Sequence, residues 1–288
     1  MAVLAETPQA AHAEIRAALS LQTAPSAAEH AELFAFNLYP YASVYLGAEG
    51  MLGGEARDRI AGFWRALGLV PPSEPDHLVA LLGLYASLRE REASEADDGR
   101  RLLIAHARDT LLAEHVAPWA FAYLDKVREL GAPFYRAWAT LACEALVAEG
   151  VEGGNVPGVP IVVREVPTVD GDDGDLDAFL NSLLAFARSG AILTRADLRR
   201  AGERLGLAVR HGERRYILRA LLSQDAPATL RWLREEADAW ATRHETLLGA
   251  PAAVRAHGAT RARRTAEVLA VAAEQAGDFV EPRGGAIL

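Results

Sequence analysis

Apolar residues recur along this chain mainly at intervals of three and four positions, which is the period of an amphipathic helix. In 55–68 one helical face is apolar, and 76–92 repeats the pattern. The face in 55–68 comprises Ile60, Phe63, Trp64 and Leu67, and the default interpretation of Trp64 is a core residue. Alanine, leucine and arginine dominate while β-branched residues are sparse, which also favours helix. The remaining helices predicted before residue 150 are 26–38, 100–116, 118–130 and 133–149. The sequence therefore predicts an all-α protein that begins with a helical bundle.

This helical pattern breaks over residues 150–175, which are rich in glycine and proline and end in acidic residues, as a linker does. The apolar run 159–166 has strand composition, but prolines punctuate it, so we expect an extended segment on the surface of a helical body. Helical periodicity then returns in a second section. Its predicted helices are 176–188, 194–205, 211–223, 226–248 and 259–276, the second of them opened by Thr194 as N-cap with Asp197 as its N3 partner.

The same patterns predict how the chain is divided into parts. The helical core follows a short leading segment, and the linker separates it from the second helical section. The five predicted parts are an N-terminal segment (1–25), the helical core (26–149), the linker (150–175), a C-terminal helical section (176–248) and a terminal helix with its tail (249–288).

Composition and charge narrow the class of protein. The 288 residues are 51% apolar and 24% charged, as in a globular protein, and the apolar runs are too short to span a bilayer. A net charge of −9 argues against binding nucleic acid over the whole surface. The single cysteine, Cys143, excludes an intrachain disulfide and any multi-cysteine metal site. The first thirty residues lack the pattern of an export signal, so we expect a cytoplasmic protein.

No familiar catalytic motif occurs in the sequence. GxSxG, GxGxxG, GxxxxGK[ST] and HExxH are all absent, which favours a binding protein over an enzyme. Glu74 and His77 have the spacing of a di-iron Glu-x-x-His pair, but such sites need two pairs, and Pro75 marks a helix start between them. We therefore expect no metal and no resident cofactor.

One segment carries a strong positive charge. Residues 188–219 hold nine arginines and three acids, a net of +6 that leaves −15 on the rest of the chain. The simpler interpretation is a solvated helical face. Alternatively, Arg195, Arg199 and Arg204 form a dock for phosphate or an acidic client surface. Residues 194–219 also have the outline of a helix-turn-helix, so a DNA-binding regulator is the alternative function.

Five segments, taken in order, carry a further pattern. They are LFAFNLYPYASVY (33–45), GGEARDRIAGFWRALGL (53–69), PSEPDHLVALLGLY (72–85), LLAEHVAPWAFAYLDKV (111–127) and GAPFYRAWATL (131–141). In this order they resemble the molybdoenzyme-maturation chaperones of the TorD, DmsD and NarJ group. Two differences from that family are a hinge at Glu74 to His77 that is one residue shorter, and tyrosines at 41 and 45 where tryptophan is frequent.

The resemblance implies a cofactor-free, all-α chaperone that binds the twin-arginine leader and apo form of a molybdopterin oxidoreductase catalytic subunit. It would hold this client until the cofactor is inserted and then release it for export. Its own contact with the molybdopterin cofactor of the client would be transient. The long linker would permit a domain-swapped homodimer, as in some relatives. A metal enzyme or hydrolase within the bundle is a further alternative. The leader groove implied by the family comprises Leu33, Phe34, Pro40, Tyr41, Ser43, Tyr45, Asp76 and His77, with His115, Pro118 and Trp119 in its far wall.

Overall fold

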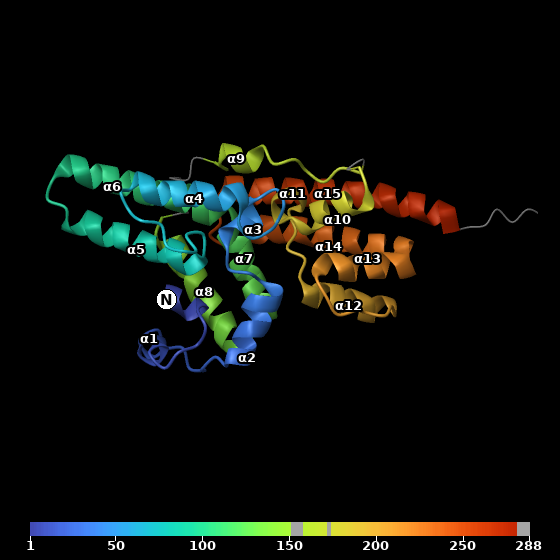
Figure 1. Ribbon diagram of the computed structural model, residues 1–288, viewed down its shortest axis with the longest axis horizontal. Helices are drawn as coiled ribbons and strands as arrows, with labels where there is room; N and C mark the ends of the chain where they lie inside the picture. The colour runs from blue at the N-terminus through green and yellow to red at the C-terminus, as the bar shows by residue number, and fades with distance from the viewer. Residues whose placement is uncertain (151–157, 172–173, 281–288) are drawn as a thin grey trace, which may run out of the picture. The chain divides into compact units, whose positions relative to one another are not determined.

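The computed structural model describes residues 1–150, 158–171 and 174–280, and it confirms the all-α prediction (Figure 1). Over those ranges no β-strand is assigned, and one isolated antiparallel bridge joins Tyr41 to His77. No helix there combines the length and apolar character needed to cross a bilayer. The chain forms two compact units. Unit 1 comprises Met1–Val166 and Thr246–His257, and unit 2 comprises Pro167–Glu245 and Gly258–Leu288.

The six helices predicted before residue 150 are present in unit 1, whereas the short helices at Ala2–Ala5, His12–Ala18 and Ala42–Leu46 were not predicted. Two of the predicted helices, 26–38 and 100–116, change from α to π winding part-way along. In chain order the elements are η1 (Ala2–Ala5, a 3-10 helix), α1 (His12–Ala18), α2 (Ala27–His30), η2 (Ala31–Asn37, π), α3 (Ala42–Leu46), α4 (Gly54–Ala66), α5 (Leu78–Ser94), α6 (Asp98–Thr110), η3 (Leu111–Val116, π), α7 (Ala117–Leu130), α8 (Pro133–Ala148) and α9 (Ile161–Arg164).

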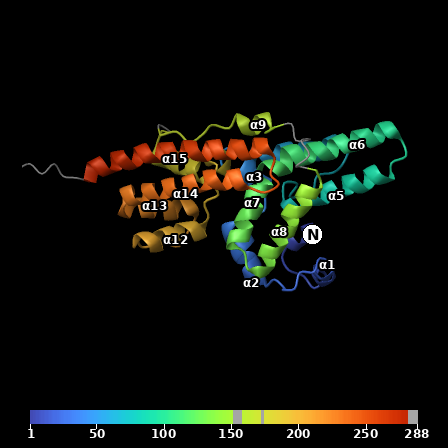
Figure 2. The same ribbon diagram turned by 180° about the vertical axis from the view of Figure 1, so that it is seen from behind.

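The core of unit 1 is built around the antiparallel pair α7 and α8, drawn in green in Figure 2. Pro118 lies in the first turn of α7, where a backbone N–H would have no hydrogen-bond partner within the helix, so its absence does not destabilise the helix. Trp119 and Trp138 are fully buried, and the Tyr45 ring stacks on Trp119 with centroids 5.1 Å apart. Large aromatic side chains bury much apolar surface, so these rings contribute strongly to the stability of this unit.

The structure corrects one prediction in the linker. The run 159–166 was expected to be extended, but Ile161–Arg164 forms the single helical turn α9. The Pro160 carbonyl accepts hydrogen bonds from the backbone N–H groups of Val163 and Arg164. No neighbouring strand is present among the described residues to pair with this segment, so its strand propensity is not realised. Val163 is buried, as expected for a segment that packs on the unit.

Unit 2 has its own apolar core, which includes Leu180, Leu198, Leu218 and Trp232. The predicted cap is confirmed, because Thr194 Oγ1 accepts the Asp197 N–H at 3.2 Å and the Asp197 carboxylate accepts the Thr194 N–H at 2.8 Å. The remaining helices lie in unit 2, except that Thr246 of α14 and residues 252–257 of α15 are part of unit 1. They are α10 (Leu176–Leu184), α11 (Phe186–Ser189), α12 (Arg195–Leu205), α13 (Arg214–Gln224), α14 (Ala226–Thr246) and α15 (Ala252–Val280).

Candidate functional site

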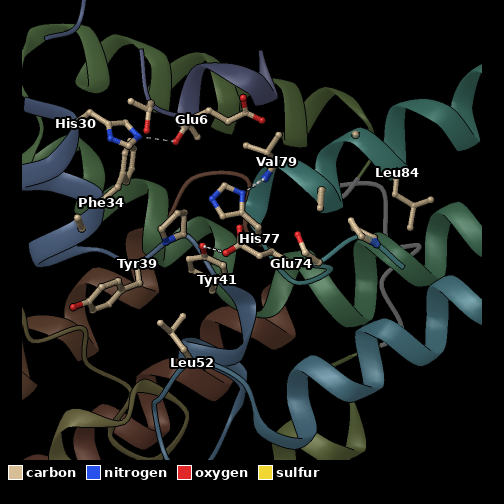
Figure 3. A pocket seen from close by; sticks show the side chains of 18 of the residues that line it. Glu6, His30, Phe34, Tyr39, Tyr41, Leu52, Glu74, His77, Val79 and Leu84 are labelled. Atoms are coloured by element: carbon tan, nitrogen blue, oxygen red, sulfur yellow. Dashed lines mark hydrogen bonds between the residues drawn. The ribbon is translucent and has the colours of Figure 1, made fainter. Parts of the chain in front are cut away.

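A deep cleft of about 1070 Å³ opens in unit 1 (Figure 3). Its walls come from residues 5–9, from η2, from residues 39–41, from the loop before α5 and from the first turns of α5. Both apolar and charged side chains face it. The lining includes the aromatic residues Phe34, Tyr39, Tyr41 and Trp64, the aliphatic residues Leu52, Leu69 and Leu84, the histidines His30 and His77, and the carboxylates Glu6 and Glu74.

Residues 40–42 and residues 76–78 form what is here called the floor of the cleft, and backbone hydrogen bonds join these two segments. The Ala42 N–H donates to the Asp76 carbonyl at 2.9 Å, and the Leu78 N–H donates to the Pro40 carbonyl at 2.8 Å. The Asp76 side chain is buried, and its carboxylate accepts the Ser43 N–H at 3.3 Å at the start of α3. Asp76, one of the groove residues implied by the family, thus connects the two segments of the floor.

Tyr41, Glu74 and His77 form one polar group on this floor. The Tyr41 hydroxyl donates to Glu74 Oε1 at 2.9 Å, and its ring meets the His77 ring edge-on at 4.8 Å. Burial and Glu74 raise the pKa of Tyr41 to about 12. His77 Nδ1 accepts the Val79 N–H at 3.2 Å and so caps α5.

The protonation state of His77 follows from these contacts. Burial lowers the pKa of His77 below 6.5, although Glu74, Glu6 and Asp76 oppose the shift. The ring is therefore neutral at pH 7. Because Nδ1 accepts a hydrogen bond, we assign the proton to Nε2, which makes His77 a donor toward the cleft.

The structure separates the predicted groove residues into two groups. Phe34, Pro40, Tyr41 and His77 line the cleft. The others lie behind it, in the floor or the core, where Trp119 Nε1 donates to the His115 carbonyl at 2.8 Å. Burial, with a smaller effect from Arg59, lowers the pKa of His115 to about 4. The binding role of this second group stays a prediction: Leu33, Ser43, Tyr45, Asp76, His115, Pro118 and Trp119.

Other lining residues were missed by the sequence interpretation. Ala5, Glu6, Thr7 and Gln9 belong to a short stretch without helical periodicity, so no pattern pointed to them. Trp64 was assigned to the core by default, yet it is only partly buried and lines the cleft. The one available signal was the proline-bounded segment before α5, whose Glu74 does reach the cleft.

Comparison with protein families bears on this part of the chain. Residues 2–125 match the model of the nitrate reductase delta subunit family. Proteins of the nitrate reductase delta subunit family are maturation chaperones of molybdoenzymes and not catalysts. All residues that line the cleft fall within the match. No curated protein and no solved structure gives a significant match to the chain.

The arginine-rich helices lie in unit 2, beyond the part that matches the nitrate reductase delta subunit family. Arg204 pairs with Glu235 at 2.7 Å, and Arg200 pairs with Asp197. Arg199 is exposed and Arg195 is partly buried. Part of the positive charge of α12 is therefore compensated within the unit. Docking of a client, or of DNA through α12 and α13, stays a prediction.

Proposed function

We propose that this chain is a maturation chaperone for a molybdopterin oxidoreductase, and that the cleft binds the twin-arginine leader of the apo catalytic subunit. The chain acts by binding alone, and it meets its client in the cytoplasm before export. The observation that carries the proposal is the composition of the cleft. Aromatic and apolar walls surround two carboxylates that make no ion pair within the described residues, in the segment that matches a chaperone family.

The apolar part of a leader needs an apolar surface that is accessible in the folded protein. Leu52, which lines the cleft, is 55% exposed, and its neighbour Met51 is also exposed. Phe36 and Val70, which adjoin the lining residues Ala35 and Leu69 in sequence, are exposed as well. Exposed apolar side chains in and next to the lining of a cleft suit a peptide that lays apolar residues into a groove.

The two arginines of a leader need carboxylates in the site that binds them. Glu6 and Glu74 face the cleft, and neither makes an ion pair with any residue that the structure describes. Arginine guanidinium groups bind carboxylates through paired, charge-assisted hydrogen bonds. The net charge of −9 further favours encounter with a basic peptide.

The size of the cleft is compatible with a peptide. Pockets for small molecules measure about 300–1,000 Å³, and this cleft, at about 1070 Å³, lies at the upper end of that range. It therefore has room for a segment of several residues.

The test is titration of the purified chain with a fluorescent synthetic leader that carries two adjacent arginines and an apolar segment. We expect Leu52→Asp to weaken binding about tenfold or more, since a charge would enter the apolar wall. Leu103→Asp is the matched control, because Leu103 is an exposed leucine of α6 outside the cleft. Equal effects of the two substitutions, or no binding to the wild type, would overturn the proposal. Tight, sequence-selective binding of a DNA duplex would favour the regulator instead.

A further inference from the structure

We infer that Glu6 determines specificity in the cleft, because it and Glu74 each take one of the two adjacent arginines of the leader. The inference rests on the proposed function and assigns a role to a residue that is not among the groove residues implied by the family resemblance. Glu6 belongs to the stretch of residues 2–9, here called the η1 segment, which includes η1 and the extended residues after it.

The η1 segment is fixed to unit 1 just before Glu6. Leu4 and Ala5 are buried, and η1 packs against α5. His30 Nε2 donates to the Ala5 carbonyl at 3.1 Å. Trp138 Nε1 donates to the Met1 carbonyl at 3.2 Å. At Glu6 the backbone becomes extended. The buried residues and the two hydrogen bonds just before it therefore hold Glu6 in the lining of the cleft.

The Glu6 carboxylate is available to a ligand. The residue is only partly buried, and its side chain makes no hydrogen bond or ion pair with any residue that the structure describes. It is close enough to act on His77, because Glu6 and Glu74 both raise the pKa of that ring against the effect of burial. Figure 3 shows the Glu6 side chain on one side of the His77 ring and Glu74 on the other.

This arrangement matches the geometry of two adjacent arginines. Successive side chains of an extended peptide point to opposite sides of its backbone. A leader that passes over His77 in extended conformation therefore directs one guanidinium toward Glu6 and the next toward Glu74. The neutral His77 ring between them adds no opposing charge at pH 7. A single carboxylate would recognise only one of the two arginines.

The experiment is a set of double-mutant cycles with the synthetic leader and with two versions in which one arginine is replaced by glutamine. We expect Glu6→Gln and Glu74→Gln each to weaken binding of the twin-arginine peptide about tenfold. The effect of Glu6→Gln should disappear with one singly substituted peptide, and the effect of Glu74→Gln with the other. Glutamine keeps an acceptor for the Tyr41 hydroxyl, so Glu74→Gln changes mainly charge.

Glu14→Gln is the matched control, because Glu14 is an exposed acid of α1 that does not line the cleft. Equal losses with Glu6→Gln and Glu14→Gln would show a general charge effect and would overturn the inference. Normal leader binding with no loss in Glu6→Gln would also overturn it, while the proposed function would stand. A wild-type chain that binds no leader would overturn both.

Discussion

Replacing His115 with phenylalanine should make unit 1 less sensitive to acid. His115 lies in η3 with 8% of its surface exposed, and its ring meets Phe63 edge-on at 5.1 Å. Burial lowers the pKa of His115 from 6.5 to about 4. The folded state thus binds this proton less readily than the unfolded state does. Stability attributable to His115 is therefore complete above pH 6.5 and is lost as the pH falls toward 4.

The magnitude follows from the pKa shift. One pKa unit corresponds to about 1.4 kcal/mol of differential interaction between the two protonation states. At pH 5 the unfolded state is largely protonated at this position and the folded state is largely neutral. Integrating between pH 7 and pH 5 gives a loss of about 2 kcal/mol for the wild type from this group alone. Phenylalanine keeps a ring against Phe63 but cannot be protonated, so this loss should be absent from His115→Phe.

Hydrogen exchange of the α7 amides, corrected for intrinsic rates, measures the effect in unit 1 alone. Tryptophan fluorescence would mix both units, because Trp232 and Trp240 belong to unit 2. His106→Gln is the control, since His106 is exposed on α6 and stays in water in either state. If wild type and His115→Phe lose the same stability between pH 7 and pH 5, the reasoning from burial is refuted.

Two further predictions concern His77 and the cap of α12. Because burial lowers the pKa of His77, leader affinity should fall only in acid, at a pH under the ordinary histidine value of 6.5. A protonated His77 repels arginine and can no longer accept the Val79 N–H. Anisotropy titrations from pH 7 downward should show a flatter profile for His77→Gln, and parallel profiles would contradict the assignment. Thr194→Ala should cost unit 2 about 1–2 kcal/mol by removing the capping box. Hydrogen exchange of α12 checks this, with Thr242→Ala, an exposed threonine of α14, expected to cost much less.

The sequence predicted the helices well because periodicity is a local property. The positions of Ile60, Phe63 and Leu67 define one face of α4 without reference to the rest of the chain, and the cap at Thr194 needs only Asp197, three residues away. The linker turn was missed because its composition favours a strand. Whether a strand forms depends on a partner, and the described chain offers none there.

The cleft was harder to predict. Periodicity shows which side chains share a helical face, but it does not show which other element packs against that face. Trp119 illustrates this: the structure stacks its ring on Tyr45 and buries it in the core, and its predicted place in a groove wall stays a prediction. Glu6 could not be found at all. The hydrogen bonds that fix its segment are accepted by the backbone carbonyl groups of Met1 and Ala5. Any residue has such a carbonyl, so the amino-acid sequence does not reveal these contacts.

The floor of the cleft depends on the main chain more than on its side chains. Residues 40 and 42 are tied to 78 and 76 by backbone hydrogen bonds, which persist whichever side chains stand at Tyr41 and His77 between them. Substitutions at these two positions should therefore alter the surface of the cleft while the backbone pairing beneath it stays in place. On the proposed function, such a scaffold would let the choice of client change one side chain at a time.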